Sequence, residues 1–220
     1  MVATAAVNMD FEQARFNMIE QQIRPWEVLD SEVLDLLSVV RREDFVPEAH
    51  RELAFADLEL PIASGPGSNP SQTMLAPKLE ARLLQEVGVK NTDIALEIGT
   101  GTGYMAALLA GKAQYVYSVE IDPVLAATAK SNLEKAGVAN VAIEVGDGSR
   151  GWQPHAPYDV IVVSASTPVL PEAFLKQLRI GGRLAVIVGE LPVMEAQLII
   201  RTGENAGAAR SLPDRKSTRL

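Results

Sequence analysis

The chain has 220 residues, of which 47% are hydrophobic and 22% charged; this suits one sizeable globular domain and argues against wholesale disorder. Its formal net charge of −8 argues against a basic nucleic-acid-binding surface at the level of the whole chain. Cysteine is absent from the sequence, which excludes disulfide bonds, thiolate catalysis and cysteine-ligated zinc.

The first residues do not resemble a targeting segment. The stretch "MVATAAVNMDFEQ" lacks the basic region and the long apolar run of a secretory signal, and residues 1–9 are expected to form a disordered tail. No run of about 18 apolar residues predicts a membrane span. We therefore expect a cytoplasmic protein that contacts no membrane and no nucleic acid and holds no metal.

Residues 10–90 are predicted to form a helical appendage that carries a loop. Apolar residues recur at helical spacing, and Asp10 is a plausible N-cap of the first helix. The Pro- and Gly-rich loop "PIASGPGSNPSQTMLAP" precedes the last of these helices, in which Pro77 lies near the start and Gly88 near the end. The predicted helices cover residues 10–23, 30–40 and 76–89.

Residues 91–205 show a different pattern, in which short apolar runs alternate with helical segments. This alternation predicts an α/β fold: a Rossmann-like, doubly wound, mostly parallel sheet with helices on both faces. The predicted strands are 93–98, 115–121, 140–145, 158–165, 182–189 and 194–202, and the predicted helices are 103–113, 123–138 and 170–178.

A glycine-rich turn follows the first of these strands. In "LEIGTGTGY", Gly99, Gly101 and Gly103 lie between a strand and a helix, where they permit a tight turn and let a ligand approach the backbone. The spacing differs from the dehydrogenase pattern G-x-G-x-x-G, because position 104 is tyrosine, and no P-loop lysine follows. An ordinary turn without a ligand is the alternative.

Two acidic residues follow the next two strands. Glu120 ends the second strand and can accept hydrogen bonds from both hydroxyls of a ribose, whereas Asp147 follows the third strand and can accept from an exocyclic amine such as that of adenine. Ligands of open α/β sheets bind at the carboxyl ends of the strands, so the set fits a nucleoside without a pyrophosphate. Taken singly, Glu120 could be a solvated acid and Asp147 a turn residue.

The motifs, taken together, resemble a known family. "LEIGTGTGY", "VEI", "GDG", "PYDVIVVSAS" and "LRIGGRLAVIVG" resemble the ordered motifs of class I S-adenosylmethionine-dependent methyltransferases. "MIEQQI", "VLDLLSVVRREDFVPEAHRELAFADLELPI" and "SQTMLAPKLEARLL" resemble the protein-L-isoaspartate O-methyltransferase family, and the resemblance covers about residues 11–200. It implies S-adenosylmethionine as the cofactor, with its methionine and ribose part along Glu97, Gly99, Gly101 and Gly103, its ribose on Glu120, and its adenine at Asp147 and Gly148.

The resemblance also implies a reaction, which is methyl transfer to the carboxylate of isoaspartyl residues in damaged proteins. A carboxylate is already ionised at neutral pH, so alignment of the reacting groups matters more than a strong base. The family reads roughly Gln-Thr-Ile-Ser where this chain has Gln72, Thr73, Met74 and Leu75. Thr73 is therefore the catalytic candidate, unless it caps the following helix.

Leu75 stands at the position of the family's serine and cannot donate a hydrogen bond. Ser164, Ser166 and Thr167 could compensate for the missing hydroxyl. Three functions therefore stay open: methylation of isoaspartyl peptides or proteins, methylation of a different acceptor on the same fold, and cofactor binding without turnover. The sequence does not predict the oligomeric state.

The C-terminal stretch 206–220, "AGAARSLPDRKSTRL", shows no strand pattern. It is expected to be irregular and non-native. Because the methyltransferase fold usually closes with an antiparallel strand, we expect that strand to be missing and the chain to be incomplete.

Overall fold

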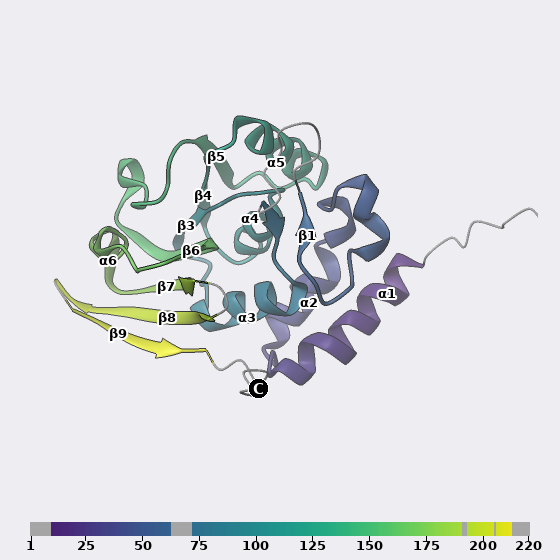
Figure 1. Cartoon of the computed structure of the whole chain (residues 1–220), viewed down its shortest axis with the longest axis horizontal. Helices are drawn as coiled ribbons and strands as arrows, with labels where there is room; N and C mark the ends of the chain where they lie inside the picture. The colour runs from purple at the N-terminus through teal and green to yellow at the C-terminus, as the bar shows by residue number, and fades with distance from the viewer. Residues whose placement is uncertain (1–9, 63–71, 191–192, 205, 213–220) are drawn as a thin grey trace, which may run out of the picture.

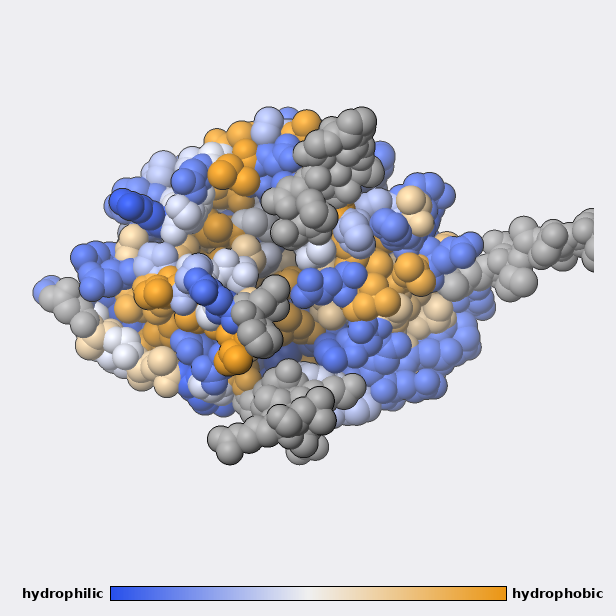
Figure 2. Space-filling model, in the orientation of Figure 1, coloured by the Kyte–Doolittle hydropathy of each residue, from blue (hydrophilic) through white to orange (hydrophobic). Residues whose placement is uncertain are grey.

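The computed structural model describes residues 10–62, 72–190, 193–204 and 206–212. A seven-stranded sheet forms its centre, and the N-terminal helices lie beside helix α3 along one side of the molecule (Figure 1). The face shown in Figure 2 is mixed, with apolar groups separated by hydrophilic ones. No helix in the described ranges is long and apolar enough to cross a bilayer.

The order of the strands in the sheet is β5-β4-β3-β6-β7-β8-β9. In this sheet β3 to β7 pair in parallel, whereas β8 pairs antiparallel with β7 and β9 antiparallel with β8. The predicted α/β class with a mostly parallel sheet is thus confirmed. The strands are β3 Ile94–Ile98, β4 Tyr115–Glu120, β5 Val141–Val145, β6 Tyr158–Thr167, β7 Leu178–Glu190, β8 Val193–Gly203 and β9 Ala206–Ser211.

Side-chain caps and glycines set the ends of several helices. The Asp10 carboxylate accepts hydrogen bonds from the first turn of α1, and Asp30 does the same for α2. Helix α1 continues through a π-helical turn over Ile19–Ile23, and α3 ends at Gly88 in the left-handed conformation. The α-helices are α1 Phe11–Met18, α2 Ser31–Val39, α3 Pro77–Val87, α4 Tyr104–Ala110, α5 Pro123–Lys135 and α6 Glu172–Gln177.

Alternate residues of the central strands enter two apolar cores. Val160 and Val162 of β6 face a large core that also contains side chains of α1 to α4. Ile161 and Val163 face a second core that contains Phe174 of α6. Because successive side chains of a strand point to opposite faces, both faces of this buried strand are apolar, as expected for a parallel sheet covered on both sides. The large core joins the N-terminal helices to the sheet without a break.

The final antiparallel strand is present, so the prediction that it is missing is wrong. Strand β9 pairs antiparallel with β8, and the side chains of β9 are all exposed. Main-chain hydrogen bonds hold such an edge strand without any apolar alternation, which explains why "AGAARS" gives no strand pattern. The predicted irregular stretch therefore begins no earlier than Leu212, and residues 213–220 lie outside the described residues.

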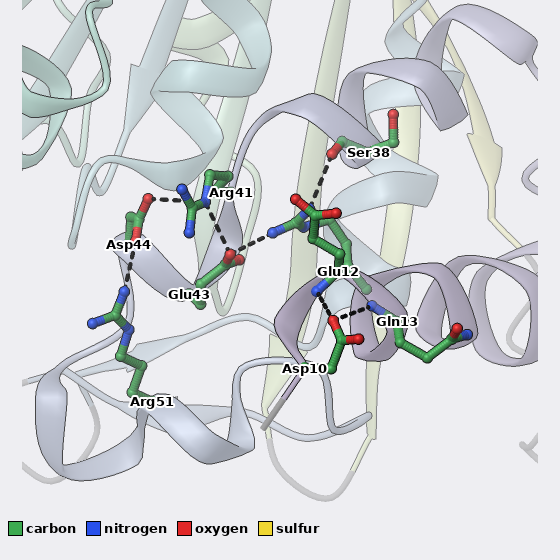
Figure 3. Close-up of polar contacts among 9 residues, drawn as sticks. Asp10, Glu12, Gln13, Ser38, Arg41, Glu43, Asp44 and Arg51 are labelled. Atoms are coloured by element: carbon green, nitrogen blue, oxygen red, sulfur yellow. Dashed lines mark hydrogen bonds and ion pairs between the residues drawn. The ribbon is translucent and has the colours of Figure 1, made fainter. Parts of the chain in front are cut away.

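Charged side chains connect the N-terminal helices to the segment that follows them (Figure 3). The guanidinium of Arg15 in α1 forms a buried ion pair with Glu43 and donates to the carbonyl of Ser38 at 3.3 Å. Arg41 pairs with the same Glu43 and with Asp44. These contacts fix the direction in which the chain leaves α2 toward the loop ahead of α3.

Candidate active site

The glycine loop between β3 and α4 has a conformation that excludes larger side chains. Gly101 and Gly103 have φ angles of +54° and +91°, in the left-handed region that favours glycine. A Cβ atom at position 101 would lie 3.1 Å from Ile62 Cδ1, and one at position 103 would lie 3.3 Å from Ala129 on α5. The loop thus runs close both to Ile62 and to helix α5.

Glu120 at the end of β4 is buried, not solvated, with 5% of its surface exposed. Its carboxylate accepts a hydrogen bond from the backbone N–H of Gly101 at 2.8 Å and another from the N–H of Asp122 at 3.1 Å. A carboxylate offers about four acceptor positions, so two stay available for a ligand. Glu120 therefore both orders the glycine loop and retains capacity to bind hydroxyl groups beside it.

Glu97 at the end of β3 lies at the centre of a buried chain of hydroxyl groups. Its carboxyl accepts from Ser118 at 2.6 Å and from Ser164 at 2.9 Å. The Ser118 and Thr100 hydroxyls are 2.6 Å apart, so one of them donates to the other. Burial raises the pKa of Glu97 to about 8, so that at neutral pH this carboxyl group is mostly protonated.

Asp147 and Gly148 follow β5 at the same edge of the sheet. Asp147 is exposed, and its carboxylate accepts from the N–H of Ser149 at 2.9 Å, a bond that lowers the pKa of Asp147. This is the turn role that the sequence analysis gives as the alternative, and the exposed carboxylate has further acceptor positions for a ligand. Gly148 is buried, and a Cβ atom there would approach Ile98 to 2.8 Å.

Thr73 belongs to a short strand on the other side of the glycine loop. Strand β2, Thr73–Met74, pairs antiparallel with β1, Leu60–Pro61. The hydroxyl of Thr73 donates to the Glu59 carboxylate at 3.0 Å. The N-cap of α3 is Ala76, without a side-chain cap, so the alternative in which Thr73 caps this helix is wrong.

One pocket brings these segments together. The glycine loop, β2 and the end of β6 surround it, and it joins residues 73–75 to residues 97–105. Six residues named as candidates from the sequence line this pocket: Thr73, Leu75, Glu97, Gly99, Gly101 and Ser164. Further lining residues, which the sequence pattern did not single out, are Ile62, Met74, Glu80, Thr100, Thr102, Tyr104 and Met105.

The other candidate residues lie outside the lining of this pocket. Gly103 contacts α5, and Asp147 and Gly148 lie beyond β5. Ser166 is exposed, and the Thr167 hydroxyl donates to the carbonyl of Val169 at 2.8 Å. Of these three hydroxyl residues in the last part of β6, Ser164 is thus the one in the pocket. In the described ranges no group of three or more His, Asp or Glu side chains is arranged to hold a metal ion.

Leu75 presents an apolar wall where a hydroxyl is expected. Its side chain is 9% exposed and packs into the large core, and it lines the pocket beside Thr73. Its backbone carbonyl accepts a hydrogen bond from Arg42 at 2.7 Å. The hydroxyl groups that line the pocket come instead from Thr73, Thr100, Thr102, Tyr104 and Ser164.

Comparison with known proteins decides the family. The sequence model of protein-L-isoaspartate(D-aspartate) O-methyltransferase matches residues 13–218. The chain belongs to this family. The match includes residues 206–218, most of the stretch that the sequence analysis expects to be non-native.

Individual members of the family agree over most of the chain. The protein-L-isoaspartate O-methyltransferase of Protochlamydia amoebophila is 41% identical over 205 residues, which are 89% of this chain and 94% of the relative. A solved protein-L-isoaspartate O-methyltransferase superposes with a TM-score of 0.76 at 29% identity; 91% of this chain is covered, and it spans 63% of that longer chain. A Plasmodium falciparum protein solved with S-adenosyl-L-homocysteine has the same fold, with a TM-score of 0.71 at 19% identity over 91% of this chain and 94% of that one.

Proposed function

We propose that this protein transfers a methyl group from S-adenosylmethionine to the free carboxylate of isoaspartyl residues in damaged peptides and proteins. The observation that carries the proposal is the pocket lined by Thr73, the glycine loop and Glu97, in a chain of the isoaspartyl O-methyltransferase family. A cytoplasmic location, and the absence of nucleic-acid and membrane partners, stay predictions.

The residues at the carboxyl edge of the sheet fit S-adenosylmethionine, which when bound supplies a methyl group on a positively charged sulfur. Gly99 and Gly101 present backbone without a Cβ atom to the pocket, so a ligand can lie directly against the loop. Glu120 accepts hydrogen bonds from the ribose hydroxyls through its two remaining acceptor positions. Asp147 accepts from the adenine amine, and Gly148, which packs against Ile98 at the end of β3, lies next to the ring.

Glu97 and Gly103 have supporting roles in this binding site. The Glu97 carboxyl group lines the pocket and holds Ser118 and Ser164 in place, which fixes the polar side of the methionine-binding part. Gly103 allows α4 to start close to α5, so that the N-terminus of α4 points its free N–H groups toward the glycine loop.

Thr73 orients the acceptor carboxylate. Its hydroxyl already donates to a carboxylate, that of the exposed Glu59, and a bound isoaspartyl carboxylate takes the place of this partner. Because the acceptor is ionised at neutral pH, the protein has to align it, not deprotonate it. Leu75 beside Thr73 contributes an apolar wall that keeps water from the reacting groups.

A second candidate function uses the same cofactor with a different acceptor. The buried Leu75 favours it, because the pocket has no hydroxyl at that position to hold a carboxylate. The two functions differ in substrate and agree in the proposed cofactor site.

Labelled S-adenosylmethionine and a pair of peptides that differ only in one linkage test the proposal. The isoaspartyl peptide should form a labelled, base-labile methyl ester, and the same peptide with a normal aspartyl linkage should not. Calorimetry without a peptide measures cofactor binding separately. Tight cofactor binding without label in either peptide would favour the second candidate, and no cofactor binding would exclude both.

A further inference from the structure

Arg42 is fully buried and contacts four different parts of the chain. It lies in the helical turn Arg42–Asp44, and its exposed surface is 0%. The guanidinium donates to the carbonyl of Ala54 at 2.9 Å and to that of Leu75 at 2.7 Å. It forms an ion pair with Glu80 of α3, and its carbon lies 5.0 Å from the centre of the Tyr104 ring.

Three of these four partners line the pocket. Leu75 directly follows β2, and Tyr104 opens α4 directly after the glycine loop; both line the pocket. Glu80 of α3 is the third lining residue. Arg42 thus connects three segments that line the pocket, although it does not itself line it.

Only an arginine can make this set of contacts. Its planar guanidinium carries five N–H donors in a fixed fork, and its faces can stack on an aromatic ring. Three of its nitrogens serve three acceptors here, and one face lies over Tyr104. A lysine would keep the charge but could not serve the three acceptors and the ring in one geometry.

Stability alone does not account for this arrangement. A buried ion pair pays a desolvation penalty that often cancels its attraction, and well-packed apolar residues of similar volume can replace it without loss of stability. Burial raises the pKa of Glu80 to about 7 in spite of the adjacent guanidinium, which shows how strongly this site disfavours charge. The contacts that an apolar replacement would lose, besides the ion pair itself, are those to the carbonyls of Ala54 and Leu75 and to the Tyr104 ring.

We propose that Arg42 is a positioning residue, which with Glu80 sets the distance between the strand that carries Thr73 and the glycine loop. In this way it fixes where the acceptor carboxylate meets the methyl donor. The inference rests on the proposed function of the pocket. It adds a residue of the N-terminal segment that does not line the pocket and acts on it through Leu75, Glu80 and Tyr104.

Another buried ion pair, Arg15–Glu43, provides a matched control. Arg15 and Glu43 have side chains that are 9% and 0% exposed. Among the described residues that contact Arg15, Ser38 and Phe55 also lie outside the pocket lining. The two pairs therefore share burial and chemistry and differ in whether they touch the pocket.

The test compares two double variants, Arg42→Met/Glu80→Leu and Arg15→Met/Glu43→Leu, with the wild type. Thermal unfolding, calorimetry with S-adenosylmethionine and steady-state methylation of the isoaspartyl peptide are measured for each protein. Both double variants should fold. We expect kcat to fall about 100-fold in Arg42→Met/Glu80→Leu, because a displacement of about 1 Å can cost that much, and to change less than about twofold in the control. The dissociation constant of S-adenosylmethionine should change less than about threefold in both.

The outcomes separate this inference from the proposed function. A wild type that forms no ester overturns the proposed function and this inference with it. An active wild type with an equally active Arg42→Met/Glu80→Leu variant overturns the inference alone, as does an equal loss of kcat in both double variants. If Arg42→Met/Glu80→Leu does not fold, Arg42→Lys replaces it: this variant keeps a charge beside Glu80, and a kcat equal to that of the wild type would overturn the inference.

Discussion

The carboxylate of Glu120, at the end of β4, accepts a 2.8 Å hydrogen bond from the backbone N–H of Gly101. The acid proposed to hold the ribose thus also holds the loop against which the ribose lies. Gly101 lies in the loop between β3 and α4, and Glu120 is the last residue of β4. Their hydrogen bond therefore connects the glycine loop to the end of the neighbouring strand, at the carboxyl edge of the sheet. The site is therefore partly organised before any ligand binds.

Replacement of Glu120 should weaken cofactor binding strongly. Glu120→Gln removes the charge and one acceptor site, and hydrogen bonds to charged groups contribute about 1.5–3 kcal/mol each, so the affinity should fall about 10- to 100-fold. Calorimetry with S-adenosylmethionine measures it. Glu134→Gln, on the exposed side of α5, is the control and should bind like the wild type. Unchanged affinity in Glu120→Gln would exclude Glu120 from the cofactor site.

Thr73→Val should separate catalysis from cofactor binding. Valine keeps the shape of the side chain and removes the hydroxyl that we propose to orient the acceptor. Loss of one such donor in a reacting site costs about 10²–10³ in kcat. We expect a fall of about this size with the isoaspartyl peptide and an unchanged dissociation constant for S-adenosylmethionine. A variant with normal kcat would show that Thr73 is not the orienting group.

Leu75→Ser should lower the stability of the protein and raise its activity. Truncation of a buried leucine costs about 2–5 kcal/mol, and Leu75 is 9% exposed in the large core, so the melting temperature should fall. The new hydroxyl would lie next to Thr73 and give the carboxylate a second donor, which should raise kcat about tenfold. Leu75→Ala is the matched control, because it makes a similar cavity without the hydroxyl. Equal kcat in the two variants would contradict the prediction.

The buried Glu97 should make stability depend on pH. Burial raises its pKa from 4.5 to about 8, so the folded protein holds a proton that the unfolded chain releases. The stabilisation is complete below pH 4.5 and is lost as the pH rises through 8, by at most about 5 kcal/mol. Glu97→Gln cannot titrate, so between pH 5 and 8.5 its free energy of unfolding should fall less than that of the wild type. Urea denaturation at several pH values measures both; parallel pH profiles would contradict the assignment.

Close contact with α5 should make Gly103 less tolerant of a side chain than another glycine with positive φ. Gly103→Ala combines backbone strain of about 1–2 kcal/mol with a Cβ atom 3.3 Å from Ala129. Gly137 has a φ of +71° and open space around it, so Gly137→Ala has the strain alone. Urea denaturation should show the larger loss for Gly103→Ala. Equal losses would mean that α5 moves aside without cost.

Local patterns were sufficient to predict most of the fold. The strands β3 to β8 contain apolar runs that can be recognised without knowing which strands they pair with. Asp10 and Gly88 mark helix ends, because an aspartate side chain can cap an N-terminus and glycine readily adopts the left-handed conformation at a C-terminus. Strand β9 could not be found in this way, because all its side chains are exposed and its pairing with β8 uses the main chain. An edge strand of small, exposed residues has no hydrophobic pattern of its own, so it is recognised only by its pairing with the neighbouring strand.

The site residues could be predicted where a tight turn requires glycine or where a residue follows the end of a strand. The three glycines, Glu120 and Asp147 follow strands whose ends must meet at one edge of the sheet. The buried charges of Arg42 and Glu80 were not predictable, because a charged residue on a helical segment normally faces water. Only the packing of the N-terminal segment against α3 and α4 reveals that both are inside.

The large apolar core has a consequence for how the protein opens. Met18 of α1, Leu37 of α2 and Val160 of β6 belong to the same cluster, so the helices before residue 90 share one interior with the sheet. Slow amide exchange in α2 and in β3 should then report the same global opening, with the same free energy and the same denaturant dependence. The boundary predicted near residue 90 marks a change in the sequence pattern from helices alone to alternating strands and helices. The segments on its two sides should nevertheless unfold together, as a single cooperative unit.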